Sequence, residues 1–135
     1  MALRRIVLRD FVIVHELELD LESGFTVLTG ETGAGKSILV DALQLVTGAR
    51  ADSGVVREGA SRTDVSAEFD SPDSVRETLL EAGFDVSDAL LLRRTVDVAG
   101  KSRAWINGSP ATAQQLRTVG EQLLDIHGQH AWQSL

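Results

Sequence analysis

The segment that most constrains the fold of this chain is Gly-Glu-Thr-Gly-Ala-Gly-Lys-Ser at residues 30–37, which fits the pattern G-x-x-x-x-G-K-[ST] in full. The short, mostly apolar run 25–29 precedes it and predicts a buried strand. The stretch 36–47 follows it, with apolar residues around a narrow polar stripe of Asp41 and Gln44, and predicts a mostly buried helix. A glycine loop between a strand and a helix is typical of P-loop domains. The sequence therefore predicts an α/β fold with a mixed β-sheet and flanking helices.

The residue types in this loop suit a chain of phosphates bound together with a metal ion. Its glycines allow successive backbone N–H groups to point at an anion, and the start of the following helix adds a partial positive charge. We expect Lys36 to contact the β- and γ-phosphates and the Ser37 hydroxyl to bind Mg²⁺. The competing interpretation is a glycine-rich turn with an exposed lysine. The predicted site for ATP and Mg²⁺ comprises Gly30, Glu31, Thr32, Gly33, Ala34, Gly35, Lys36, Ser37 and Ile38.

Alternation of apolar and polar residues predicts further strands on both sides of the loop. These strands cover residues 4–10, 16–21 and 64–69, and a hairpin of 90–98 with 102–106 closes around Ala-Gly-Lys at 99–101. The stretch 49–63 is polar and aperiodic, which indicates a loop with short ordered pieces.

Three helices are expected, and glycine ends two of them. Gly48 is placed to end the helix after the P-loop. In the second helix Ser71 can act as the cap, Pro72 suits the first helical position and Gly83 stops the helix. Residues 107–110 indicate a loop before the third helix, which is expected to reach about Gln122 on a stripe of Leu116, Val119 and Leu123 and to be followed by a short strand at 123–127.

Composition restricts the class of protein. The 135 residues are 43% hydrophobic, which indicates one globular domain. The absence of cysteine excludes disulfides, thiolate zinc sites and cysteine nucleophiles, and it fits a reducing compartment. Charged and polar residues interrupt the apolar start of the chain, so we expect neither a signal peptide nor a membrane contact, and a cytoplasmic location.

Charge argues against a surface that is basic throughout, because 13 Lys and Arg oppose 20 Asp and Glu to give a net charge of −7. Any DNA contact must therefore be local. Two basic clusters could supply it, although solvated surface charge is the simpler interpretation: Arg50, Arg57 and Arg62, and then Arg93, Arg94, Lys101 and Arg103. Trp105 and Trp132 are expected in the core or at an interface, because neither lies in a basic, aromatic-rich stretch.

A second acidic metal ligand, which P-loop catalysis needs at the end of an apolar strand, is not evident. Asp125 is the nearest candidate, but polar residues precede it and an ordinary solvated carboxylate is the better interpretation. The pair His127 and His130 lacks a third ligand for a metal site. Gln129 could reach Mg²⁺ or an attacking water through its side-chain oxygen, and it is the remaining catalytic candidate beside Lys36.

With these motifs placed, the chain resembles the RecN family of bacterial DNA-repair proteins, SMC-like members of the ABC-type ATPases. The residues that carry the resemblance lie at 8–13, 28–37, 41–43, 48–51, 102–108 and 125–130, the last being Asp-Ile-His-Gly-Gln-His. The resemblance implies an ABC/SMC-type head in which residues 1–135 form the N-terminal half. The C-terminal half of the same polypeptide would follow a long coiled coil and carry the signature motif, the catalytic Glu and the switch histidine.

The same resemblance implies the partners and the roles. ATP would lie between the heads of a homodimer that acts on DNA double-strand breaks in the nucleoid, and Gln129 would be the Q-loop residue that contacts Mg²⁺ and water. Two other functions stay open on the residues alone. One is a self-contained P-loop phosphotransferase with Arg50, Arg57 and Arg62 as a lid, and the other is a nucleotide-responsive interaction module without hydrolysis.

Overall fold

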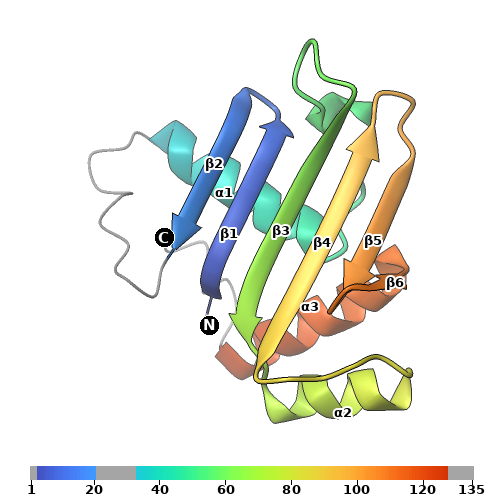
Figure 1. Ribbon diagram of the computed structural model, residues 1–135. Helices are drawn as coiled ribbons and strands as arrows, with labels where there is room; N and C mark the ends of the chain where they lie inside the picture. Colours follow the sequence, from blue (N-terminus) through green and yellow to red (C-terminus); the bar gives the residue numbers. More distant parts are fainter. Residues whose placement is uncertain (1–2, 21–32, 128–135) are drawn as a thin grey trace.

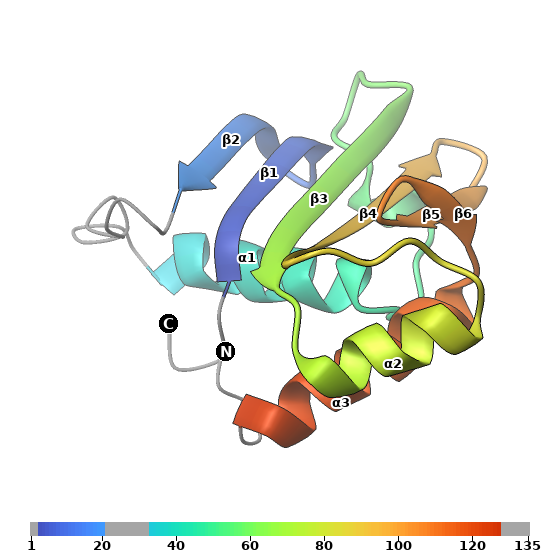
Figure 2. The same cartoon turned by 60° about the horizontal axis from the view of Figure 1, so that its bottom comes forward.

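The computed structural model describes residues 3–20 and 33–127 of the chain, and within them a single sheet carries all three α-helices on one face (Figures 1 and 2). In chain order the elements are β1 (Leu3–Phe11), β2 (Val14–Asp20), α1 (Gly33–Val46), the short 3-10 helix η2 (Ser53–Val55), β3 (Arg62–Asp70), α2 (Asp73–Glu81), β4 (Ala89–Asp97), β5 (Ser102–Ile106), β6 (Ser109–Ala111) and α3 (Ala113–His127).

The six described strands lie in the order β2-β1-β3-β4-β5-β6, and every neighbouring pair is antiparallel. Side chains alternate between two faces because successive residues of a strand point in opposite directions. On β3 the residues Thr63, Val65, Ala67 and Phe69 are buried on the inner face, toward the helices. The intervening residues Asp64, Ser66 and Glu68 lie on the outer face, which no described helix covers (Figure 2). The expected α/β fold with flanking helices is confirmed.

The core lies between the inner face and the helices. Helix α1 runs behind the strands from β2 toward β4 (Figure 1), and it contacts β3 and β4. Helices α2 and α3 lie side by side near the end of the sheet where β3 ends and β4 begins, and α3 contacts β5. Burial of a leucine or phenylalanine side chain contributes roughly 1.5–3 kcal/mol. The largest fully buried side chains are therefore the main source of stability: Phe11, Phe69, Ile6, Leu8, Leu43, Leu79, Leu90, Leu92, Ile106, Leu116 and Leu123.

The loop between α1 and β3 is ordered by contacts with the turn between β1 and β2. The amide of Val12 donates to the carbonyl of Val55 at 2.8 Å, and the amide of Arg57 donates to the carbonyl of Asp10 at 2.8 Å. Asp10 and Val12 have positive φ angles of 51° and 55°, which non-glycine residues rarely adopt. These backbone bonds hold the turn in that conformation. The sequence correctly indicated short ordered pieces here, of which η2 is one.

Two expectations about helices were wrong. Pro72 occupies the cap position of α2 instead of its first turn, and no side chain caps that helix; the Ser71 hydroxyl is buried without a hydrogen-bond partner. The strand expected at 123–127 is instead the end of α3, because the stripe of Leu116, Val119 and Leu123 continues the helical period without a break.

Residues 107–110 also differ from the expectation of a loop before a helix. Asn107 and Gly108 both have positive φ, 51° and 85°, and form a two-residue turn that joins β5 to β6. Helix α3 begins at Ala113, after β6, with a capping box. The Gln115 amide donates to the Thr112 hydroxyl at 3.0 Å, and the Thr112 amide donates to the Gln115 side-chain oxygen at 2.9 Å.

The expected strands at 4–10, 16–21 and 64–69, the hairpin of 90–98 with 102–106, and the ends of helices at Gly48 and Gly83 are confirmed within a residue or two. The buried strand expected at 25–29 lies outside the described residues. In the described ranges, no helix has the length and apolar character required to cross a membrane.

Candidate nucleotide-binding site

The second half of the P-loop motif, residues 33–37, forms the beginning of α1, three residues earlier than the sequence suggested. The first turn of this helix carries no acidic residue, so no carboxylate of its own competes for its positive end. The first four N–H groups of a helix lack partners within it, and they can bind an anion. Gly30, Glu31, Thr32, Gln129 and Trp132 lie outside the described residues.

Burial fixes the position of α1 on the sheet. Five residues of the helix are at most 4% exposed, and they pack on the inner face: Leu39, Ala42, Leu43, Leu45 and Val46. Ile38, one of the predicted site residues, is partly buried and packs against the same core. A helix with this much buried surface cannot slide or rotate without exposing apolar groups to water. The helix start that carries Lys36 and Ser37 is therefore attached to a rigid body.

The far end of α1 is closed by a Schellman motif. Gly48 has φ of 101°, its amide donates to the Leu45 carbonyl at 3.2 Å, and the Ala49 amide donates to the Gln44 carbonyl at 2.9 Å. A Cβ atom on Gly48 would lie 2.6 Å from the Arg117 backbone nitrogen of α3. Both the backbone conformation and the close approach of α3 thus require glycine at this position.

Arg94 on β4 contacts the C-terminal end of α1 from the inner face of the sheet. Its side chain is 3% exposed, and one guanidinium nitrogen, Nη1, donates to the carbonyls of Leu45, at 2.9 Å, and Ala49. The Nε donates to the Ser102 hydroxyl of β5 at 3.0 Å. Burial lowers the pKa of Arg94, and the nearby charge of Arg117 lowers it further. A buried cation with carbonyl partners at a helix C-terminus stabilises the negative end of the helix dipole.

Arg117 on α3 adds a second cation at the same place. Its Nη2 donates to the Gly48 carbonyl at 3.3 Å and its Nη1 donates to the Gln114 side-chain oxygen at 3.0 Å. Helix α3 comes close to α1 because Gly120 has no side chain; a Cβ there would lie 2.7 Å from Cβ of Thr47. Arginines from β4 and α3 therefore hold the C-terminal end of the helix that begins with the P-loop residues.

The role of Arg94 is a correction to the sequence analysis, which grouped it with surface cations. The alternation of β4 contained the signal, because Leu90, Leu92, Arg94 and Val96 occupy one face and three of them are apolar. Proximity along the chain to Arg93 and Lys101 was the misleading feature.

The first basic cluster of the sequence is divided in space, whereas three members of the second, Arg93, Lys101 and Arg103, line one hollow. Arg57 lies 3.8 Å from the Asp10 carboxylate, and Arg62 lies on the outer face in a hollow that it shares with Lys101 and Arg103. Arg50 lies in the loop that follows α1. Among the described residues, no ion pair or hollow brings together the three arginines suggested as a lid.

Asp125, considered as a second acidic metal ligand, and His127, considered as a metal ligand, both lie at the end of α3. Asp125 lies within that helix and not at a strand end, and His127 is its last residue. His130 lies outside the described residues. Among the described side chains no group of three or more His, Asp or Glu residues is arranged to hold a metal ion.

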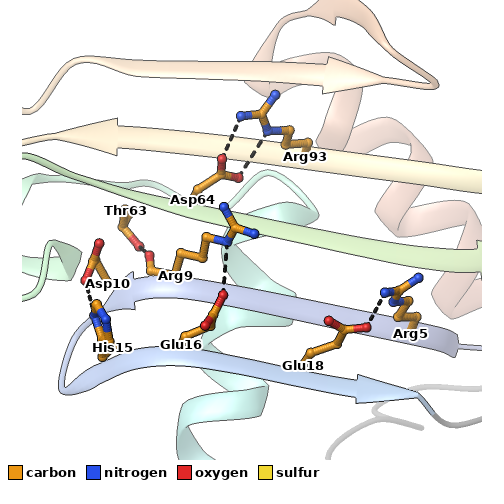
Figure 3. A network of polar contacts seen from close by, with 9 residues as sticks. All are labelled: Arg5, Arg9, Asp10, His15, Glu16, Glu18, Thr63, Asp64 and Arg93. Atoms are coloured by element: carbon orange, nitrogen blue, oxygen red, sulfur yellow. Dashed lines mark hydrogen bonds and ion pairs between the residues drawn. The ribbon is translucent and has the colours of Figure 1, made fainter.

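The outer face carries a network of ion pairs (Figure 3). Arg93 of β4 donates two hydrogen bonds to Asp64 of β3, Nε to Oδ1 at 3.1 Å and Nη2 to Oδ2 at 2.6 Å, and these bonds raise the pKa of Arg93. The Arg93 guanidinium also lies over the ring of Trp105, 4.7 Å from its centroid. Trp105 is half-buried on this face, in contact with a cation from a neighbouring strand.

Sequence comparisons identify the family of this chain. Residues 5–119 match the AAA domain family. The DNA repair protein RecN of Xylella fastidiosa (strain Temecula1) is 47% identical over 98% of this chain, and RecN of Bacillus subtilis is 44% identical over 95%. The chain spans only 24% and 23% of the length of these two relatives.

Solved structures with the same fold are SMC heads and RecF. An SMC ATPase studied for ATP-driven dimerization superposes with a TM-score of 0.67 at 24% identity, over 90% of this chain and 80% of that one. RecF bound to ATP superposes with a TM-score of 0.56 at 17% identity, over 82% of this chain and 28% of that one. The chain belongs to the AAA domain family, and within it resembles RecN proteins in sequence and SMC heads in fold.

Proposed function

We propose that residues 1–135 are the ATP-binding, N-terminal half of an SMC-like ATPase head that acts in recombinational repair of DNA double-strand breaks. The observation that carries the proposal is the position of residues 33–37: they begin a rigidly packed helix whose first turn has no acidic residue. The RecN relatives and the SMC-type fold support it. Because the chain spans about a quarter of its relatives, the activity belongs to a longer polypeptide.

Each site residue then has a role. Backbone N–H groups of the loop, from Gly30 to Lys36, and of the helix start at Ser37 and Ile38 bind phosphate oxygens, and Lys36 adds a positive charge. The Ser37 hydroxyl and the Gln129 side-chain oxygen hold Mg²⁺, and Gln129 also orients the attacking water. Bound Mg²⁺ neutralises charge on the phosphates. The residue types fit this ligand because the helix start is free of carboxylates and carries both a lysine and a hydroxyl.

The partners follow from the same proposal. The C-terminal half of the polypeptide completes the head, and two heads form a homodimer around ATP. Binding of ATP closes the heads and hydrolysis reopens them, while the protein is bound to DNA in the cytoplasmic nucleoid. The residues that complete hydrolysis come from the other half of the head.

The test is the affinity of the full-length protein for ATP, measured by isothermal titration. Lys36→Ala should weaken binding at least tenfold, because a charge-assisted contact to an anionic oxygen contributes roughly 1.5–3 kcal/mol. Lys101→Ala is the matched control, since Lys101 is the other lysine of the chain and lies in the exposed turn between β4 and β5. Wild-type affinity in the Lys36 variant, or equal losses in both variants, would contradict the assignment.

A further inference from the structure

Most arginines of the outer face are neutralised by carboxylates of the adjacent strand. Arg5 on β1 pairs with Glu18 on β2, and Arg9 pairs with Glu16 at 3.6 Å (Figure 3). The bidentate pair of Arg93 with Asp64 does the same between β4 and β3. Acidic and basic side chains therefore alternate from strand to strand, and this part of the face has little unbalanced charge.

One corner of the face departs from this pattern. A hollow of about 370 Å³, which we call the hairpin hollow, lies at the end of the sheet where β3 begins and the turn from β4 to β5 is located. Arg62, Lys101 and Arg103 line it, all three are exposed, and none makes an ion pair with a described residue. In a chain with a net charge of −7, three cations gathered without carboxylate partners indicate a surface that binds an anion.

The acidic residue of the hollow, Asp97, forms no ion pair with these cations. Asp97 stands opposite Arg62 in the strand register, but its Oδ1 accepts hydrogen bonds from the amides of Ala99 and Lys101, both at 2.9 Å. These bonds direct the carboxylate into its own turn, where it shapes the hairpin. Arg62, Lys101 and Arg103 together outnumber this one carboxylate, so the hollow keeps a net positive charge for a ligand.

Two residues that line the hollow, Arg93 and Trp105, already have interaction partners within the protein. The guanidinium of Arg93 is fixed between the Asp64 carboxylate and the ring of Trp105, so it has no free charge to offer. The Trp105 ring and the Arg93 guanidinium over it line the same hollow as the three cations. Binding does not have to order this part of the surface first, which reduces its entropic cost.

The cations of the hollow come from two strands and the turn between β4 and β5. Arg62 lies on β3 and Arg103 on β5, two strands apart, so their backbones are separated by roughly 10 Å. A phosphodiester backbone presents successive anionic groups along its length, which cations at separate positions on the sheet can contact one by one. Exposed arginines and lysines of this kind are the usual contacts to nucleic-acid phosphates.

We propose that the hairpin hollow binds the phosphodiester backbone of DNA, with Arg62, Lys101 and Arg103 contacting the phosphates. The choice of DNA as the polymer rests on the function proposed above, while the choice of surface rests on the unpaired cations. This contact is separate from the ATP site, since the hollow lies on the outer face of the sheet and α1 lies against the inner face.

The test compares two double variants of the full-length protein that change the net charge equally. Arg62→Gln with Arg103→Gln alters the hollow, and Arg5→Gln with Arg76→Gln alters exposed arginines elsewhere. Binding to labelled duplex and single-stranded oligonucleotides is followed by fluorescence anisotropy over a series of salt concentrations. The hollow variant should bind duplex about tenfold more weakly, with a salt slope smaller by roughly 2, because each substituted arginine no longer neutralises a phosphate.

Unchanged affinity and slope in the hollow variant, or the same loss in the control variant, would overturn the proposal. A loss confined to one kind of oligonucleotide supports it and identifies that strand form as the ligand. Titration of ATP without DNA keeps this result apart from the proposed function. The hollow variant should bind ATP as the wild type does, whereas Lys36→Ala should lose ATP and keep DNA binding measured without nucleotide.

Discussion

Arg94→Met is the substitution that most directly tests how the P-loop helix is held. Methionine is of similar length and apolar, so it can fill the space that the Arg94 side chain occupies beneath α1. It cannot donate hydrogen bonds, and the carbonyls of Leu45 and Ala49 and the Ser102 hydroxyl each lose one. The helix dipole also loses a cation at its negative end.

The expected loss of stability follows from these hydrogen bonds. Those from a charged donor contribute roughly 1.5–3 kcal/mol each, so three of them amount to about 5–9 kcal/mol. Returning a guanidinium to solvent recovers several kcal/mol, because burial of a charge without an acidic partner is unfavourable. The lowered pKa of Arg94 agrees in sign with that penalty. The difference leaves a net destabilisation of about 2–4 kcal/mol, or a fall in Tm of about 7–14 °C for a domain of this size.

The assay is thermal and urea unfolding followed by circular dichroism, with hydrogen exchange of the amides at 44–49 as a local probe. Arg103→Met is the matched control, because Arg103 is exposed on β5 and makes no ion pair with a described residue; its effect should stay within about 0.5 kcal/mol. Arg94→Lys should be intermediate, since a point charge cannot reach three acceptors at once. If Arg94→Met unfolds with the wild-type midpoint, the hydrogen bonds do not hold α1.

Two further predictions concern catalysis. In the full-length protein Gln129→Ala should lower ATP turnover much more than ATP affinity, measured by steady-state kinetics and titration; equal losses would remove Gln129 from the catalytic residues. Residues 1–135 alone should release no phosphate from ATP above background, because Asp125 lies in α3 and the start of α1 has no acidic residue. Phosphate release that disappears in Lys36→Ala would instead indicate a self-contained enzyme.

Local pattern in the sequence is sufficient to predict the strands and most helices. Alternation in β3 and β4 identifies both strands and the face that is buried, since each residue type matches its side of the sheet. The errors came from short segments taken separately from their neighbours. The segment 123–127, expected as a strand, continues the apolar stripe of α3. Asn107-Gly108 is typical of a hairpin turn, but the following Pro110 led to the expectation of a helix start.

The arrangement of the charged side chains depends on strand order, which the local sequence does not contain. Asp64 and Arg93 are 29 residues apart and meet only because β3 and β4 are neighbours. Arg62 joins Lys101 and Arg103 for the same reason, although the sequence placed it with Arg50 and Arg57. Composition shows how many charges a chain has, but pairing of strands decides which of them stay without a partner.

Two consecutive arginines of β4, Arg93 and Arg94, have different roles on the two faces of the sheet. Since neighbouring residues of a strand face opposite sides of the sheet, Arg93 lines the hairpin hollow while Arg94 holds the end of α1. Each guanidinium is fixed by more than one partner, and β4 is paired on both sides, with β3 and β5. A displacement of β4 would therefore have to break interactions on both faces at once. Strand β4 therefore contributes to both the surface proposed for DNA and the support of the helix proposed for ATP, so a substitution in β4 itself, unlike one at Arg62 or Arg103, must be judged by its effect on both ligands.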